Sequence, residues 1–185
     1  TFPAKHDTYE DYLKTLKIAY LYGKTITLSN THWPETNAKM LKNRRIGLSQ
    51  SGVVQGFNKH GRRQMYDWCD KAYEHVKQLD EDYSNWLCIP KSVRMTSIKP
   101  SGTVSLLNGS TPGIHYPEDE YYIRRIRFAK SSDLLESLEN AGYNIEDDKY
   151  SPNTSVVEFP VHEPFFTKGK RDVSMWEQLE IAAQY

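Results

Sequence analysis

A strand, a turn and a short helix are expected to meet in Ser97-Ile98-Lys99-Pro100-Ser101-Gly102-Thr103-Val104-Ser105. The β-prone run 93–98 leads into the Pro-Ser-Gly-Thr turn, and a helix is predicted over residues 103–107. A strand that enters a glycine turn and continues as a helix is typical of α/β proteins. We therefore expect an α/β fold with this turn at the end of one of its strands.

The turn has the chemistry of a phosphate cradle. Pro100 fixes the direction of the chain, and Gly102 lets a ligand come close to the backbone. Unpaired N–H groups and hydroxyls would gather at the positive end of the helix dipole. The predicted phosphate-binding residues are Ser101, Gly102, Thr103, Val104 and Ser105. The spacing is not that of a Walker A loop, and the alternative is an ordinary capped helix start.

A second loop follows this helix closely. Residues 108–117 are rich in glycine and proline, which predicts a stiff, irregular segment. Its central part is Pro112-Gly113-Ile114-His115. His115 could act as an acid, a base or a ligand, and the alternative is a histidine that packs or hydrogen-bonds locally.

The rest of the chain alternates between helical and extended patterns. Apolar residues at helical spacing predict helices over residues 9–22, 35–42, 49–59, 62–86, 133–141 and 174–185. Further strands are predicted over residues 25–28, 121–129 and 154–161. Gly23, Gly61 and Gly142 are expected to end helices. In the strand 121–129 we expect Ile123, Ile126 and Phe128 to face inward, and the alternative is that the interleaved arginines meet anions.

Composition excludes several classes of function. The 185 residues suit one domain or a large piece of one, and 24 basic residues balance 24 acidic ones. A net charge of zero gives no general reason to bind a nucleic-acid polymer or an anionic membrane. Cys69 and Cys88 form neither a Cys-x-x-Cys pair nor a zinc spacing, so we expect no metal site and a reducing, cytoplasmic setting.

One segment offers a DNA-binding alternative. Residues 43–57 resemble the start of a helix-turn-helix, in which Arg44, Arg45, Arg62 and Arg63 would touch phosphates. Gly52 and Gly56 would then lie inside a helix, and acidic residues follow at once. Because a basic stripe is the expected footprint of DNA binding, this alternative is disfavoured. Glycines four apart more often indicate close packing of helices.

Five segments occur in an order that is shared with a known family. They are Asn43-Arg44-Arg45-Ile46-Gly47, Ser84-Asn85-Trp86-Leu87-Cys88-Ile89-Pro90, Lys99-Pro100-Ser101-Gly102-Thr103-Val104-Ser105-Leu106-Leu107, Thr111-Pro112-Gly113-Ile114-His115 and Tyr121-Tyr122-Ile123-Arg124-Arg125. In this order they resemble the adenosylcobalamin-dependent (class II) ribonucleotide reductases, above all the monomeric ribonucleoside-triphosphate reductase branch. Both ends of the chain look like that branch too.

The resemblance implies a fold and a set of partners. The family's catalytic domain is a ten-stranded α/β barrel made of two halves, and residues 1–185 would form a single partial domain in its C-terminal half. The Pro-Ser-Gly-Thr turn would bind the substrate phosphates, and the loop 112–115 would lie near the nucleoside or the cobalamin. The resemblance also implies adenosylcobalamin as cofactor, a ribonucleoside triphosphate as substrate, a thioredoxin-type reductant and the remainder of the reductase chain.

Departures from the family pattern limit what this chain can do alone. The family's radical-bearing cysteine lies in an Asn-x-Cys-x-Glu motif, which this sequence lacks, and Cys69 and Cys88 do not match it. The reducing cysteines are missing as well. We therefore expect no catalytic residue here and an inactive isolated chain. The start without Met and a final helix without a stop signal also favour a fragment. The alternative is a free-standing nucleotide-binding or regulatory module.

Overall fold

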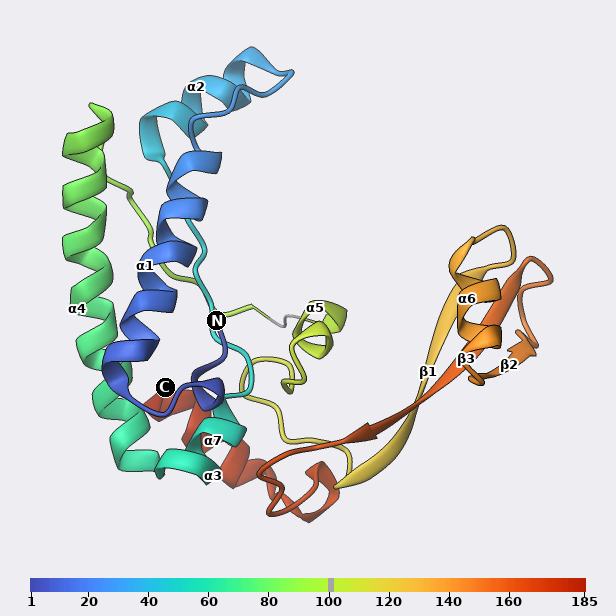
Figure 1. Ribbon diagram of the computed structural model, residues 1–185. Coiled ribbons are helices and arrows are strands. Elements are labelled where there is room, and N and C mark those ends of the chain that lie inside the picture. Colours follow the sequence, from blue (N-terminus) through green and yellow to red (C-terminus); the bar gives the residue numbers. More distant parts are fainter. Residues whose placement is uncertain (100–101) are drawn as a thin grey trace.

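The computed structural model describes residues 1–99 and 102–185. It forms an open arch with helices on one side, a small sheet on the other and one short helix between them (Figure 1). The helical arm consists of α1 (Tyr9–Ile26), α2 (Pro34–Asn43) and α4 (Arg62–Leu87). The strand arm consists of β1 (Tyr121–Ala129), α6 (Leu134–Asn140), β2 (Asn144–Asp147) and β3 (Thr154–His162).

The base of the arch joins the two arms. It contains α3 (Val53–His60) and α7 (Met175–Gln184), with short 3-10 helices at Pro3–Lys5 and Lys170–Asp172. The short helix between the arms is α5 (Gly102–Leu107). The predicted helices over 35–42, 62–86 and 133–141 are confirmed within a residue or two at each end.

Two apolar clusters stabilise the helices. Thr8 caps α1 through a hydrogen bond from the Asp11 amide, and the apolar spacing of α1 and α4 turns one face of each helix inward. The lower cluster contains Tyr12, Leu16, Val53, Val54, Phe57, Met65, Trp68, Ala72, Tyr116 and Ile181. The upper cluster contains Tyr20, Ile46, Val76, Leu79 and Tyr83. The core of this chain therefore lies in the helical arm and the base.

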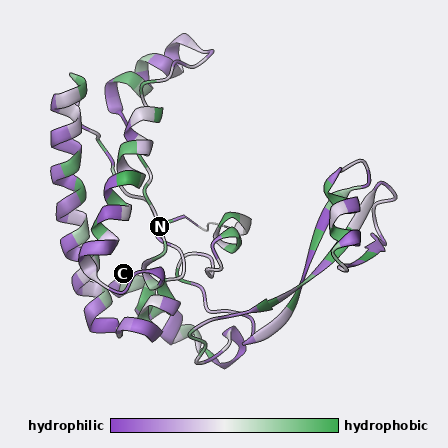
Figure 2. Ribbon diagram, in the orientation of Figure 1, coloured by the Kyte–Doolittle hydropathy of each residue, from purple (hydrophilic) through white to green (hydrophobic). Residues whose placement is uncertain are grey.

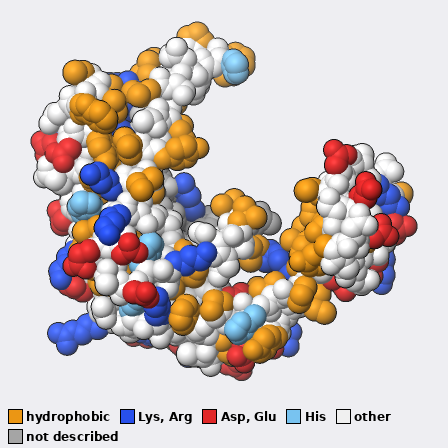
Figure 3. Space-filling view, viewed as in Figure 1, with side chains coloured by type: hydrophobic (Ala, Val, Ile, Leu, Met, Phe, Trp, Pro, Cys, Tyr) orange, Lys and Arg blue, Asp and Glu red, His pale blue; other side chains and the backbone are white. Residues whose placement is uncertain are grey.

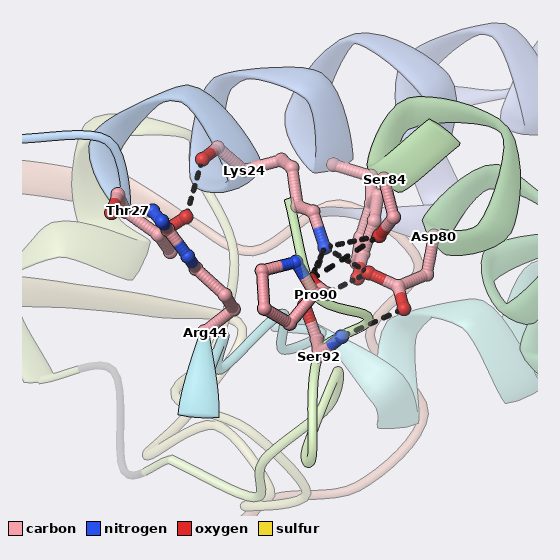
Figure 4. Close-up of polar contacts among 8 residues, drawn as sticks. Lys24, Thr27, Arg44, Asp80, Ser84, Pro90 and Ser92 are labelled. Atoms are coloured by element: carbon pink, nitrogen blue, oxygen red, sulfur yellow. Dashed lines mark hydrogen bonds and ion pairs between the residues drawn. The ribbon is translucent and has the colours of Figure 1, made fainter. Parts of the chain in front are cut away.

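A buried polar cluster also joins the helices of this arm. The Lys24 ammonium lies 2.6 Å from Asp80 Oδ1, 2.8 Å from Ser84 Oγ and 2.9 Å from Ser92 Oγ (Figure 4). The Tyr20 hydroxyl donates to the same carboxylate at 2.7 Å. Burial alone would raise the pKa of Asp80, but hydrogen bonds from Lys24, Tyr20 and Ser92 outweigh it and lower the pKa. Lys24 is fully buried, so the cluster neutralises a charge inside the arm.

The end of α1 differs from the sequence prediction. We expected Gly23 to stop the helix and residues 25–28 to form a strand, but α1 continues to Ile26. Gly23 lies in close contact with Ile46, because a Cβ there would be 3.1 Å from Ile46 Cγ2. The helical turn also places Lys24 against Asp80, so tertiary contacts override the β propensity of this segment.

Extended segments lie beside the helices. Leu48 and Thr96 form a parallel bridge, and the Ile46 amide donates to the Arg94 carbonyl at 2.8 Å. The strand predicted over 93–98 is therefore a short parallel contact rather than a regular strand. Residues 49–52 also remain outside the helix predicted over 49–59, which begins only at Val53. Leu48 and Met95 pack on the upper cluster, so helices cover one face of these segments.

The strand arm is an antiparallel sheet in the order β1-β3-β2. The strands predicted over 121–129 and 154–161 are confirmed, whereas the short polar strand β2 was not predicted. Ile123 was expected to face inward, but it is 63% exposed. The two-residue period of β1 places Ile123 with Arg125, whereas Arg124 shares the partly buried face with Ile126.

Apolar side chains remain exposed on several helices. Hydrophobic and hydrophilic residues alternate along α1 and α4 in Figure 2, and Figure 3 shows apolar side chains at the surface of both arms. Ile18, Tyr22 and Ile26 lie one helical turn apart on α1 and are all exposed. These faces are unpartnered within the described residues. No helix in residues 1–99 or 102–185 is long and apolar enough to cross a membrane.

Candidate functional site

The predicted phosphate turn includes the first residues of α5. Ser101 lies outside the described residues, and α5 begins at Gly102, whose φ of 48° is in the region that favours glycine. A Cβ on Gly102 would meet no atom of the described residues within 4 Å. The Val104 side chain is 70% exposed. Within the described residues, no atom therefore covers the Cβ position at the start of this helix.

Ser105 serves the turn itself in this structure. Its hydroxyl donates to the Gly102 carbonyl at 2.7 Å, and its side chain is buried. The Ser105 carbonyl accepts hydrogen bonds from the Ser110 hydroxyl at 2.8 Å and from the Ser110 amide at 3.1 Å. Ser105 thus connects α5 to the loop that follows it, while its role toward phosphate stays a prediction.

The loop after α5 is fixed by the start of α3. The Gly52 amide donates to the Thr111 carbonyl at 2.8 Å, and the Val53 amide donates to the Gly113 carbonyl at 3.1 Å. These contacts satisfy N–H groups that a helix start leaves without partners. A Cβ on Gly113 would lie 3.1 Å from the Lys99 carbonyl oxygen. The structure therefore brings the loop 112–115 against the residues that lead into the phosphate turn.

The Gln55 side chain on α3 forms hydrogen bonds with the same loop. Its side chain is only 2% exposed. Its Oε1 accepts from the Thr111 amide at 3.0 Å, and its Nε2 donates to the Gly109 carbonyl at 3.3 Å and to Glu163 Oε2 at 2.9 Å. Sequence reasoning missed Gln55, because it is one polar residue within a helical pattern. A glutamine between buried Val54 and Phe57 was the only signal.

Glu163 follows β3 and is almost completely buried. Its Oε1 accepts a hydrogen bond from the Tyr122 hydroxyl at 2.8 Å, and its Oε2 faces Gln55. Burial raises the pKa of Glu163, although the hydrogen bond from Tyr122 and the charges of His162 and Arg124 oppose this effect. Burial and the neighbouring carboxylate raise the pKa of Tyr122 to about 12. Tyr122 therefore remains a hydrogen-bond donor at neutral pH.

A cavity of about 390 Å³ lies beside these residues. Pro112, His115, Tyr122, Arg124 and Glu163 are among its lining residues. The exposed His115 is therefore directed to a cavity rather than into the core.

The other two residues of the predicted loop, Gly113 and Ile114, have different surroundings from His115. Ile114 packs on the lower apolar cluster, and its carbonyl accepts from Gln178 Nε2 at 3.3 Å. Gly113 is buried between Val53 and Lys99. These contacts show how the loop is held in place, and they do not test a role toward a ligand.

A larger cavity of about 460 Å³ lies near the chain start. Gln50 accepts from the Tyr185 hydroxyl at 2.8 Å and donates to the Tyr12 hydroxyl at 2.6 Å at its wall. Burial raises the pKa of the Cys69 thiol in this wall to about 11, so the thiol is protonated at neutral pH. Cys69 and Cys88 are both free cysteines.

Two of the four arginines of the DNA-binding alternative, Arg44 and Arg62, have partners within the chain, whereas Arg45 and Arg63 are exposed. Arg44 is buried and donates to the Thr27 carbonyl at 2.5 Å (Figure 4). Arg62 pairs with Glu177 at 3.0 Å. Gly52 precedes α3, and Gly56 inside it lies close to Met65, where a Cβ would be 3.0 Å from Cε. The glycine spacing therefore reflects helix packing, which removes support from the DNA-binding alternative.

Comparison with solved structures shows which class of protein this chain resembles. The chain superposes on a crystal structure of a B12-dependent (class II) ribonucleotide reductase with a TM-score of 0.80. The match has 31% sequence identity and covers 93% of this chain and 28% of the other. It confirms the expected fold class, because mixed helices and a small sheet match part of that enzyme. No family model matches the chain.

Curated relatives define the branch. A probable adenosylcobalamin-dependent ribonucleoside-triphosphate reductase of Dictyostelium discoideum is 52% identical to this chain over 99% of its length. The adenosylcobalamin-dependent ribonucleoside-triphosphate reductase of Euglena gracilis is 50% identical, also over 99% of this chain. The reductase of Lactobacillus leichmannii is 36% identical over 82% of the chain. The chain is thus a homologue of part of the adenosylcobalamin-dependent ribonucleoside-triphosphate reductases. It spans about a quarter of the length of these relatives.

Proposed function

We propose that the chain is a fragment of a ribonucleoside-triphosphate reductase and that α5 binds the phosphates of the substrate. The observation that carries the proposal is the first turn of α5, where Gly102 has a glycine-favoured conformation and no described residue lies within 4 Å of its Cβ position. The N–H groups of Gly102, Thr103 and Val104, with the Ser101 hydroxyl, are the proposed phosphate donors. Ser105 would complete the site by holding the turn in shape.

The second loop would border the same site. We assign Pro112 and His115 to the vicinity of the nucleoside or the cofactor, because both line a cavity next to α5. Gly113 and Ile114 would hold the loop through their contacts with α3 and α7. A neutral or charged imidazole at His115 could donate a hydrogen bond to a polar group in this cavity.

The relatives are named for adenosylcobalamin, and we infer the same cofactor for the full-length enzyme. When bound, it supplies the radical that starts ribonucleotide reduction, while protein residues orient and shield the reacting groups. Val104 and Leu107 are exposed apolar side chains beside the proposed site. An apolar surface of this kind suits a large cofactor that must be kept from water.

The chain by itself would not turn over substrate. We infer that neither thiol takes part in the reaction, and two observations support this: burial raises the pKa of the Cys69 thiol, and Cys88 lies at the end of α4. A thioredoxin-type reductant, the rest of the reductase chain and a cytoplasmic setting complete the proposal. An in-frame Asn-x-Cys-x-Glu motif upstream of Thr1 would support it, and turnover by the isolated chain would contradict its inactivity.

Gly102→Val in the full-length reductase tests the phosphate site. The branched side chain would cover the N–H groups at the start of α5, so we expect the KM for the ribonucleoside triphosphate to rise about tenfold. Gly142→Val is the matched control, because Gly142 also has a positive φ of 82° and no neighbour within 4 Å of a Cβ. Equal KM values for the two variants would contradict the phosphate-binding role of α5.

A further inference from the structure

Gln55 connects three parts of the chain that are distant in sequence. Its amide belongs to α3, contacts Gly109 and Thr111 in the loop after α5, and reaches Glu163 beyond β3. Both amide hydrogens and the amide oxygen have partners within hydrogen-bond distance. A buried amide with all these groups satisfied favours one arrangement of its neighbours, because any displacement leaves a polar group unpaired.

Glu163 continues this connection into the strand arm. Its second oxygen accepts from Tyr122 of β1, and its backbone amide donates to the Glu120 carbonyl at 2.9 Å. The residue is only 4% exposed, so the hydrogen bonds from its two side-chain donors offset part of the cost of burying the carboxylate. The sheet otherwise packs mainly on itself. Gln55 and Glu163 therefore relate the base of the strand arm directly to the loop after α5.

The connection ends at the helix that carries the proposed phosphate donors. Thr111 is held by Gln55 and follows Ser110, whose hydroxyl and amide both donate to the Ser105 carbonyl in α5. A displacement of Gln55 would thus be transmitted over two residues of backbone to α5. Hydrogen bonds weaken steeply with poor distance and angle, so a displaced α5 would bind phosphate less tightly.

We propose that Gln55 and Glu163 are positioning residues that hold α5 in the orientation needed to bind the substrate phosphates. The inference rests on the proposed function of α5 and adds the residues that fix it. Neither side chain has to touch the substrate. They act on α5 through one hydrogen bond between them. In this bond the Gln55 amide donates and the Glu163 carboxylate accepts.

The test exchanges the two groups in the full-length reductase. Gln55→Glu places a carboxylate against Glu163 and removes the donor, so we expect the KM for the ribonucleoside triphosphate to rise about tenfold. In this variant kcat should change less than KM. The double variant Gln55→Glu/Glu163→Gln restores a donor and an acceptor in reverse order, and its KM should return to within about threefold of the starting value. The contact to Gly109 is lost in both variants, so it cancels when the KM of the single variant is compared with that of the double variant.

Rescue of KM separates positioning from a general structural role. A folded Gln55→Glu variant with an unchanged KM overturns the proposal, and so does a folded double variant whose KM stays raised. If Gln55→Glu does not fold, the double variant decides by the same criterion. If Gly102→Val raises KM and Gln55→Glu does not, the positioning role fails while the proposed phosphate site stands. If Gly102→Val leaves KM unchanged, the phosphate site fails, and the positioning role fails with it.

Discussion

In the helical arm Tyr20, Val76 and Leu79 are buried against one another, whereas β1 in the strand arm is exposed at every second residue. The ion pairs of the two arms also differ in burial. Lys24 has its carboxylate partner inside the helical arm, but Arg125 and Lys130 meet theirs at the surface of the strand arm. Burial of side chains therefore contributes most to the stability of the helical arm. Backbone pairing and exposed ion pairs contribute most to the stability of the strand arm.

This difference has a consequence for how each arm responds to damage. A buried cluster is cooperative, because removing one member leaves the others without partners. A sheet that packs mainly on itself can open without disturbing helices that it hardly contacts. We expect mutations in the helical arm to lower the stability of the whole chain, and mutations within the sheet, away from Tyr122 and Glu163, to act locally.

Lys24→Met should have the largest effect on stability. It leaves Asp80 buried without its cation, which costs about 3–5 kcal/mol of unfolding free energy. Chemical denaturation followed by circular dichroism would measure the loss. Lys17→Met is the control, because Lys17 is exposed on the same helix and should change stability by less than about 0.5 kcal/mol. Similar losses for both variants would contradict the importance of the buried cluster.

Val157→Ala should have an intermediate and local effect. Val157 is fully buried and pairs with Ile126 on one side and Ile145 on the other. Removing its two methyl groups should cost about 2 kcal/mol within the strand arm. Amide hydrogen exchange should accelerate in β1 and β3 while α1 and α4 stay protected. Val76→Ala makes the same chemical change in the upper apolar cluster, and acceleration of helix exchange by both variants would break the distinction between the arms.

Arg125→Met should have the smallest effect. The guanidinium pairs with Glu158 at 3.5 Å and with Glu146, and it is half exposed. Exposed ion pairs contribute less than about 1 kcal/mol and are screened by salt. The variant should therefore differ from the parent at low ionic strength and match it in 1 M salt. A loss as large as that of Val157→Ala, measured by the same exchange experiment, would show that surface charge stabilises the strand arm.

The regular elements were predictable where one pattern runs without interruption. Apolar residues at helical spacing predicted α4, and alternation predicted β1 with the bounds that the structure has. The polar contacts were not predictable, because their partners are far apart in sequence. Nothing near Lys24 indicates Asp80, and nothing near Gln55 indicates Glu163. Gly23 was misinterpreted for the same reason. A glycine that packs against a distant residue such as Ile46 cannot be told from a glycine that ends a helix by its local sequence.

The candidate site was predicted only in part for a similar reason. The strand–turn–helix pattern indicated α5, and its local signals of glycine and hydroxyl residues lie within a few positions. The support of the site comes from α3 and the strand arm, which are brought to it by the fold. Local sequence therefore predicted the residues proposed to bind the ligand. It missed Gln55, which forms hydrogen bonds with the loop after α5, and Glu163, which accepts a hydrogen bond from Gln55.

The parallel contact between Leu48 and Thr96 sets a condition on how this chain folds. The connection between the two residues contains α3 and α4, so their pairing requires closing this long crossover. Closing so long a loop costs entropy before the contact repays it, and this slows folding. The helices can form early from local contacts, whereas the extended segments that lead to α5 must wait. The segment that presents the candidate site is therefore expected to be among the last parts of the chain to reach its final position.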